Sequence, residues 1–143
     1  MSECSLLNRP TKESICSKGD ASVERTQRWR FLMNTKDLID NARLTPLTTF
    51  EHREVDGVFV SDMLSDVMAG AKSGNLWITV QTHKNIVPAA NLVDVSAIVV
   101  TSGKRVPQDT LDLANQHNIG ILSTKLSTYD LIGKLYALGL VTK

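Results

Sequence analysis

Short apolar runs alternate with amphipathic segments from residue 55 to residue 140 of the chain. Four apolar runs predict β-strands, at residues 58–60, 76–80, 97–100 and 121–122. The third run is apolar at every position, which indicates a central strand covered on both faces of a parallel sheet. Strands that alternate with helices imply right-handed crossovers. We therefore predict a three-layer α/β fold with βα repeats and a mostly parallel sheet of four to five strands.

Amphipathic helices are predicted between these strands. After the first strand, five apolar residues recur at the spacing of one helix face: Met63, Leu64, Val67, Met68 and Ala71. The last helix shows the same spacing at four positions: Leu131, Ile132, Leu135 and Tyr136. Residues 86–93 and the segment that follows Pro107 are predicted to form the other two helices of the repeat.

Two further elements are predicted ahead of the repeat. A helix is expected to begin after Asn34, a good N-cap residue with Asp37 three positions later. Residues 44–50 have β character. Pro46 predicts that this is an edge or bent strand, because proline cannot donate a hydrogen bond to a neighbouring strand.

The length of 143 residues fits one domain. Residues 1–33 are polar and show no sustained apolar period, so we expect a poorly ordered N-terminal extension followed by a single domain at residues 34–143. Cys4 and Cys16 both lie in this extension, and two sulfurs without a nearby histidine do not make a zinc site. Met33 directly precedes the first predicted helix, so we expect that the natural protein can begin there.

The composition excludes several classes of partner. Sixteen basic and fifteen acidic side chains leave a formal net charge of +1, too little to attract nucleic acid or an anionic membrane. No apolar run approaches the ~20 residues that a membrane helix needs, and the N-terminus is polar and charged. We expect a cytoplasmic protein without a nucleic-acid or membrane partner.

Polar clusters follow each predicted strand. They are Ser61-Asp62, Gln81-Thr82-His83, Thr101-Ser102-Gly103 and Ser123-Thr124, with Ser127-Thr128 shortly after. In a parallel sheet the carboxyl ends of the strands lie at one edge, where helix N-termini present free N–H groups to a ligand. Turns between strands and helices need the same residue types for capping, so every cluster also has a structural interpretation.

The segment at residues 101–105 is the most suggestive of these clusters. A small turn is followed by two cations, Lys104 and Arg105, and then by a helix start. This arrangement suits an anion such as phosphate or carboxylate, although an ordinary exposed turn has the same composition. The chain contains neither a Walker P-loop nor a Gly-x-Gly-x-x-Gly motif.

The remaining clusters have several interpretations. Ser61 is either a helix N-cap, with Asp62 favouring the helix dipole, or part of a hydroxyl–carboxylate pair for a ligand. His83 is a ligand contact, an interface residue or simply exposed; as a general base it would need an orienting carboxylate and a nucleophile. His52 and His117 are expected at the surface and have no metal-ligand spacing with it. We predict no catalytic residue, no metal ligand and no cofactor.

Residues 97–103 and 118–124, with Pro107 between them, resemble the DRTGG domain. That family takes its name from an Asp-Arg element and a later Thr-Gly-Gly turn. Thr82-His83 stands where the Asp-Arg element is expected, and Ser102 replaces the first glycine of the turn, whereas Thr101 and Gly103 match. The resemblance extends over roughly residues 35–140.

Similar domains occur at the N-terminus of the bacterial HPr kinase/phosphorylase, in some phosphotransacetylases and between CBS domains in certain pyrophosphatases. In these proteins the domain accompanies the catalytic domain and is not the catalyst. The chain also resembles small single-domain members that are sometimes encoded near iron-hydrogenase and histidine-kinase-like genes. The resemblance therefore implies a regulatory or assembly role.

We therefore expect a non-catalytic regulatory or ligand-sensing module, acting as a homo-oligomer, that binds a small anionic ligand or a partner protein at the C-terminal edge of the strands. The expected ligand-binding residues are Ser61, Asp62, Thr82, His83, Thr101, Ser102, Gly103 and Thr124. The alternative is a scaffold or interaction protein that assembles with a redox complex of the hydrogenase type or a signalling complex. A small hydrolase or transferase using His83 with Asp62 is the third hypothesis.

Overall fold

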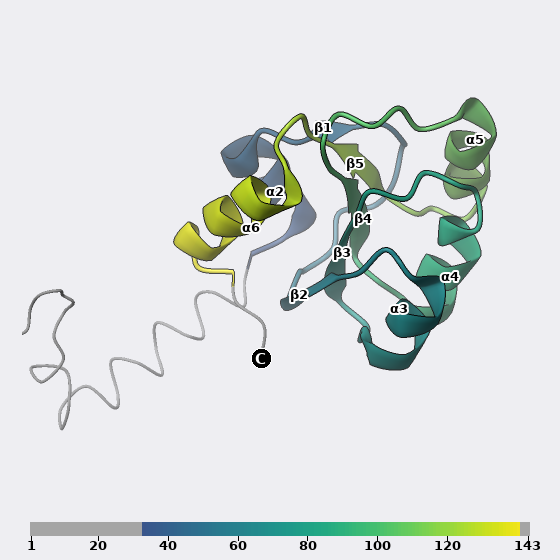
Figure 1. Ribbon diagram of the computed structural model, residues 1–143, viewed down its shortest axis with the longest axis horizontal. Helices are drawn as coiled ribbons and strands as arrows, with labels where there is room; N and C mark the ends of the chain where they lie inside the picture. Colours follow the sequence, from purple (N-terminus) through teal and green to yellow (C-terminus); the bar gives the residue numbers. More distant parts are fainter. Residues whose placement is uncertain (1–32, 141–143) are drawn as a thin grey trace, which may run out of the picture. The chain divides into compact units, whose positions relative to one another are not determined.

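The computed structural model describes residues 33–140 (Figure 1). All of the predicted N-terminal extension except Met33 lies outside the described residues, as do both cysteines. The elements, in chain order, are α2 (Thr35–Ala42), β1 (Thr45–Pro46), β2 (Gly57–Val60), α3 (Leu64–Gly70), β3 (Asn75–Thr79), α4 (Ile86–Val93), β4 (Ala97–Val100), α5 (Gln108–Gln116), β5 (Ile121–Ser123) and α6 (Thr128–Ala137).

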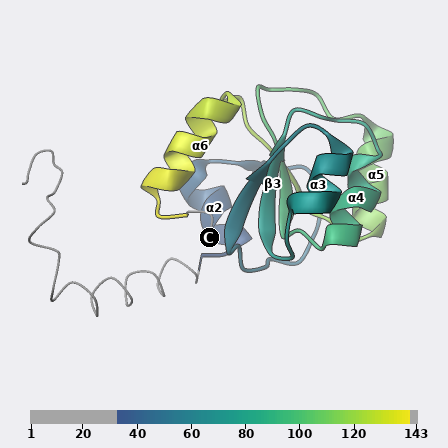
Figure 2. The same cartoon turned by 60° about the horizontal axis from the view of Figure 1, so that its bottom comes forward.

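The sheet has five strands in the order β1-β5-β4-β3-β2. Strands β2 to β5 run parallel to one another, and β1 pairs with β5 in the antiparallel direction. Helices α2 and α6 cover one face, while α3, α4 and α5 cover the other (Figures 1 and 2). The predicted three-layer α/β fold with a mostly parallel sheet is therefore confirmed.

Two apolar cores lie on the two faces of this sheet. Strand β4 contributes to both, since Ile98 and Val100 pack in the core beneath α3, α4 and α5, whereas Ala97 and Val99 pack in the core beneath α2 and α6. This alternation follows from the two-residue period of a strand. All four side chains are fully buried, as expected for a central parallel strand.

Both elements predicted ahead of the repeat are present, although β1 takes up only Thr45–Pro46 of the predicted residues 44–50. Asn34 caps α2 in a capping box: its side-chain oxygen accepts from the Asp37 N–H at 2.9 Å, and the Asp37 carboxylate accepts from the Asn34 N–H at 3.2 Å. Pro46 lies in β1, the strand at the edge of the sheet. Its missing N–H therefore removes no hydrogen bond between the inner strands.

The predicted buried stripes of two helices are only partly correct. In α3, Val67 is fully buried, but Met63 and Met68 are exposed. Met63 is the N-cap residue and precedes the helix. Met68 lies about 100° around the helix from Val67, beyond the narrow strip that contacts the sheet.

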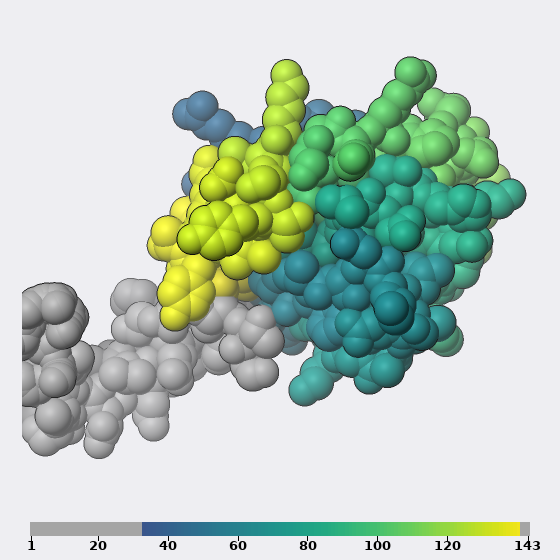
Figure 3. Space-filling model, viewed as in Figure 1, coloured from purple at the N-terminus to yellow at the C-terminus, as the bar shows by residue number. Residues whose placement is uncertain are grey.

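Helix α6 departs from its predicted stripe in the same way. Leu131 and Leu135 are buried against the sheet, while Ile132 and Tyr136, one position further on, are exposed. A single helix on the outside of a sheet buries one strip of its surface, and residues about 100° away face outward. The outer face of α6 therefore belongs to the molecular surface (Figure 3).

Candidate functional site

Hydrogen bonds join the C-terminal ends of the four parallel strands into one edge. The Thr101 N–H, just after β4, donates to the Thr79 carbonyl at the end of β3 at 3.1 Å. The Gly103 N–H donates to the Thr124 carbonyl, just after β5, at 2.9 Å. The strand-end loops that carry the eight predicted ligand-binding residues therefore lie along a single edge of the sheet.

The turn after β4 has an unusual backbone. Ser102 and Gly103 both have φ of 64°, in the left-handed region. This curvature directs the Ser102 N–H to the Leu126 carbonyl at 2.8 Å and the Gly103 N–H to the Thr124 carbonyl. Both backbone donors are thus used within the protein. The Ser102 side chain remains exposed.

Thr101 and Thr124 also make hydrogen bonds within the protein. Thr101 is fully buried and its hydroxyl shares a 2.7 Å hydrogen bond with the hydroxyl of Thr128, the first residue of α6. The Thr124 hydroxyl accepts from the Leu126 N–H at 3.2 Å, and its side chain is buried. Both threonines hold the β5–α6 loop against β4.

Ser61 and Asp62 act in the turn after β2. Ser61 is not the N-cap of α3, since Met63 occupies that position; the Ser61 hydroxyl accepts from the Met63 N–H at 3.1 Å. One carboxylate oxygen of Asp62 accepts from the Thr79 hydroxyl at 2.8 Å and from the Val80 N–H at 2.9 Å. Asp62 therefore ties the end of β2 to the end of β3.

His83 is exposed in the loop after β3. The Asn85 N–H donates to its Nδ1 at 3.2 Å, so the neutral ring carries its proton on Nε2, which faces no protein acceptor among residues 33–140. The preceding residue, Thr82, is tied to α5, because its carbonyl accepts from the Thr110 hydroxyl at 2.9 Å. Within the described chain no hydrogen bond or ion pair joins His83 to Asp62.

A pocket of about 320 Å³ adjoins His83. It lies between the start of α3 and the β3–α4 loop, and its lining consists of Leu64, Gln81, His83, Asn85 and Ile86. No residue of the β4 turn belongs to this lining, so His83 and Ser102 occupy different parts of the same edge.

Three cations lie next to the turn after β4: Lys104 and Arg105 follow it in the chain, and Lys125 lies in the β5–α6 loop. All three are exposed, and none forms an ion pair within residues 33–140. Lys125 lies against the turn, since its Cγ would be 3.9 Å from a Cβ placed on Gly103. Lys125 is not among the predicted ligand-binding residues. Its position directly after the Ser123-Thr124 cluster would have allowed its prediction.

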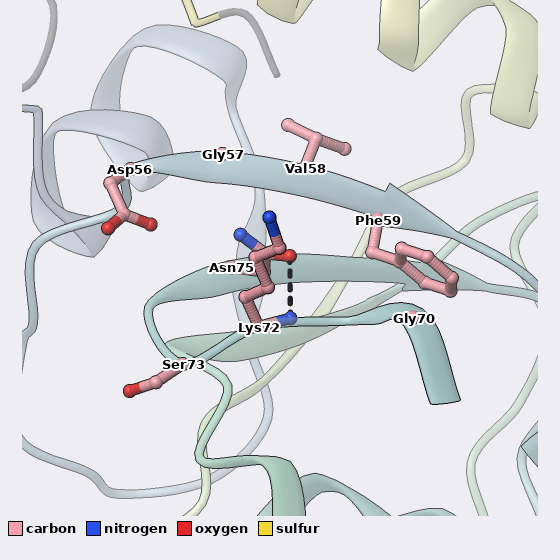
Figure 4. A pocket seen from close by; sticks show the side chains of 8 residues that line it. All are labelled: Asp56, Gly57, Val58, Phe59, Gly70, Lys72, Ser73 and Asn75. Carbon is pink, nitrogen blue, oxygen red and sulfur yellow. Dashed lines mark hydrogen bonds between the residues drawn. The ribbon is translucent and has the colours of Figure 1, made fainter. Parts of the chain in front are cut away.

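A second pocket, of about 350 Å³, lies at the opposite edge of the sheet beside β2 (Figure 4). Its polar lining includes Asp56, Lys72, Ser73 and Asn75, and the Lys72 N–H donates to the Asn75 side-chain oxygen at 3.0 Å. The sequence contains no cluster signal for this pocket, because its lining comes from β2, the α3–β3 connection and the start of β3 rather than from the polar clusters after the strands.

The ion pair found within residues 33–140, between Arg53 and Asp94, also lies away from the C-terminal ends of the strands. Arg53 donates to Asp94 through both terminal nitrogens, at 3.0 and 3.1 Å, and the Ser73 hydroxyl donates to Asp94 at 2.6 Å. The hydrogen bond from Ser73 and those from Arg53 lower the pKa of Asp94 below its ordinary value. This cluster joins the α3–β3 and α4–β4 connections.

Residues 33–140 contain no group of three or more histidine, cysteine, aspartate or glutamate side chains placed to hold a metal ion. In that same part of the chain, none of the helices combines the length and apolar character needed to cross a bilayer.

Comparison with known proteins identifies relatives of this fold. A family model described as the DRTGG domain matches residues 42–138. A solved structure, the CBS and DRTGG domains of the regulatory region of Clostridium perfringens pyrophosphatase in complex with its activator diadenosine tetraphosphate, is similar with a TM-score of 0.58 and 15% sequence identity. The similarity covers 78% of this chain and 48% of that one, and at this identity it concerns the fold. No curated protein sequence matches the chain.

Proposed function

This chain belongs to the DRTGG domain family, and from that premise we propose that it is a regulatory module, without catalytic activity of its own, that senses a small anionic ligand. The proposed binding surface is the C-terminal edge of the sheet around the turn after β4. The observation that carries the proposal is the group of three exposed cations, Lys104, Arg105 and Lys125, that have no acidic partner among the described residues.

The geometry of the turn supports this choice of surface. Ser102 and Gly103 are held by hydrogen bonds to the β5–α6 loop, so the two loops that carry the three cations are joined to each other. Unpaired cations on joined loops need little reorganisation to bind an anion. Arginine and lysine are the usual partners of phosphate groups, the first through a planar fork and the second as a point charge.

We propose a phosphate-bearing ligand on these grounds. The regulatory region of the similar pyrophosphatase was solved with a polyphosphate-containing activator, which supports polyphosphates as probes. This chain spans about half of that regulatory region. We therefore use diadenosine tetraphosphate as a test compound and do not propose that it is the natural ligand of this chain. The exposed Ser102 hydroxyl is the neutral donor of this turn that would add to the three charges.

Isothermal titration calorimetry of the full chain with inorganic phosphate, ATP and diadenosine tetraphosphate tests the proposal. We expect binding that weakens with added salt and that falls by about tenfold for each cation removed, which corresponds to ~1.4 kcal/mol of binding free energy. The variants are Lys104→Ala, Arg105→Ala and Lys125→Ala. Lys72→Ala, at the opposite edge of the sheet, is the matched control and should bind like the wild type.

Two outcomes would contradict the proposal. The first is the absence of heat with all three probes. The second is binding that Lys72→Ala weakens as much as the three edge variants do, because that result would indicate a nonspecific effect of charge.

The second candidate function is a scaffold or interaction protein, including one that assembles with a redox or signalling complex. It is favoured by exposed apolar side chains on α3 and α6, among them Met68, Tyr129 and Tyr136. Co-purification from native cells distinguishes the two functions, because a scaffold retains a stoichiometric protein partner whether or not phosphate is present.

A further inference from the structure

The pocket beside His83 contains polar side chains whose hydrogen-bonding groups the fold does not use. None of its five lining residues, which are Leu64, Gln81, His83, Asn85 and Ile86, is an acidic residue, a lysine or an arginine. Within residues 33–140, the side-chain amides of Gln81 and Asn85 form no hydrogen bond, and Nε2 of His83 has no acceptor. Leu64 and Ile86 supply an apolar wall. The pocket therefore combines an apolar surface with free neutral donors and acceptors.

The side chain of Asn85 is free although the residue stands where asparagine usually has a structural role. It occupies the N-cap position of α4, at which an asparagine side chain commonly accepts a hydrogen bond from the first turn of the helix. Here the side chain makes no capping bond. The first two N–H groups of the helix donate instead to the carbonyls of His83 and Lys84, at 3.0 and 3.1 Å. The amide of Asn85 is therefore available to a ligand.

The chemistry of this lining fits an uncharged planar heterocycle. A carboxamide presents a donor and an acceptor side by side, and asparagine and glutamine use this pair to bind N6 and N7 of adenine. The apolar wall can cover one face of the ring, as in most ligand pockets. A volume of about 320 Å³ lies at the small end of the range of ~300–1,000 Å³ for ligand pockets, which suits one ring system rather than a whole nucleotide.

The loop that forms most of this pocket lies beside the loop that carries Lys104 and Arg105. The two loops follow β3 and β4, which are neighbours in the sheet, so they begin about 4.8 Å apart. The hydroxyl of Thr110, in the first turn of α5, donates to the Thr82 carbonyl at 2.9 Å and so joins the pocket loop to the far end of the other loop. The pocket and these cations therefore occupy adjacent parts of one edge.

We propose that the pocket beside His83 binds the base of an adenine nucleotide whose phosphate groups lie on the cations next to the turn after β4. Gln81 and Asn85 would pair with the edge of the base, and Nε2 of His83 would donate to a ring nitrogen. Leu64 would cover one face of the ring. The inference rests on the proposed function, since the cations bind the phosphates, and it adds the group that distinguishes a nucleotide from other phosphate compounds.

Isothermal titration calorimetry of the full chain with ATP and with inorganic tripolyphosphate separates the two parts of the site. Both compounds carry a triphosphate chain, so we expect ATP to bind about tenfold more tightly or better, the effect of a paired base edge. Gln81→Ala and Asn85→Ala should each weaken the binding of ATP and leave the binding of tripolyphosphate unchanged. Asn91→Ala is the matched control, because Asn91 is exposed on the same helix and does not line the pocket.

Adenosine, which has no phosphate, distinguishes a failure of the pocket from a failure of the phosphate site. Equal affinities for ATP and tripolyphosphate overturn the base pocket and leave the phosphate site standing. Binding of adenosine that Asn85→Ala abolishes, without any binding of tripolyphosphate, supports the pocket and contradicts the phosphate site. A preference for ATP that Gln81→Ala and Asn85→Ala both leave unchanged overturns the pocket, as does the absence of binding with all three compounds. Circular dichroism confirms that each variant is folded.

Discussion

The carboxylate of Asp62, in the turn after β2, accepts a hydrogen bond at 2.8 Å from the hydroxyl of Thr79, the last residue of β3, although the two residues are 17 positions apart. The same oxygen accepts from the Val80 N–H. A side chain that the sequence placed in a ligand-binding cluster thus connects the ends of β2 and β3. Thr79 is buried, so its hydroxyl depends on partners within the protein.

Asp62→Ala is expected to lower the free energy of unfolding by about 1–2 kcal/mol, because the buried Thr79 hydroxyl loses its acceptor. Asp62→Asn is the control: the amide oxygen can still accept both hydrogen bonds, and the loss should be smaller. Urea denaturation measures both. Equal losses for the two variants would show that the charge, and not the hydrogen bonds, stabilises this turn.

Ser102→Gly is expected to stabilise the protein by about 0.5 kcal/mol. A non-glycine residue in the left-handed region costs about 1–2 kcal/mol, and the greater freedom of glycine in the unfolded chain cancels part of the gain. Ser102→Val should destabilise, because a β-branched residue fits this backbone poorly. A thermal unfolding series checks the order glycine, serine, valine, and a valine variant as stable as the wild type would contradict it.

The stability of the protein should depend on Asp94 as the pH falls. Its pKa is lowered in the folded state, so the ionised carboxylate stabilises the fold above about pH 4, and this contribution is lost as the pH falls through the lowered pKa. Asp94→Asn retains a residue that accepts the left-handed backbone at this position.

The difference in unfolding free energy between the wild type and Asp94→Asn should be present at pH 7 and should shrink toward pH 3. The pair is partly exposed, so the difference at pH 7 should stay below about 1 kcal/mol and should fall with added salt. If the difference in unfolding free energy does not change with pH, the charge of Asp94 is not its cause, and the change in the shape of the side chain is.

Gly120→Ala is expected to destabilise the protein by about 1–3 kcal/mol, because the new methyl group would lie 2.6 Å from the ring of Phe50. Gly133→Ala introduces the same group in open space on α6 and should not destabilise. Adding Phe50→Leu should recover part of the loss at Gly120. Losses that simply add in the double variant would rule out the contact between the two residues as the cause.

The helices and strands that depend on a local sequence pattern could be predicted from the sequence. The apolar run at 97–100 became the central strand β4, Asn34 and Asp37 became a capping box, and Pro46 lies in an edge strand. Each of these depends on residues a few positions apart: the period of apolar side chains, a cap and its third neighbour, or a missing N–H. The face that a helix buries was less predictable, because Ile132 and Tyr136 have the spacing of a buried stripe but lie beyond the contact with the sheet.

The sequence predicted only that the candidate site lies along the C-terminal edge of the sheet. The amino-acid sequence by itself determined that the strand ends carry hydroxyl, carboxylate and basic groups, and the order of elements determined that these groups share one side of the sheet. Only the tertiary structure decided which of them are already used: Asp62 by Thr79, Thr101 by Thr128, and the N–H of Gly103 by the Thr124 carbonyl. Each of these partners comes from another strand or loop, so the choice depends on where distant segments meet. The cations that remain unpaired, Lys104, Arg105 and Lys125, are defined by the same packing.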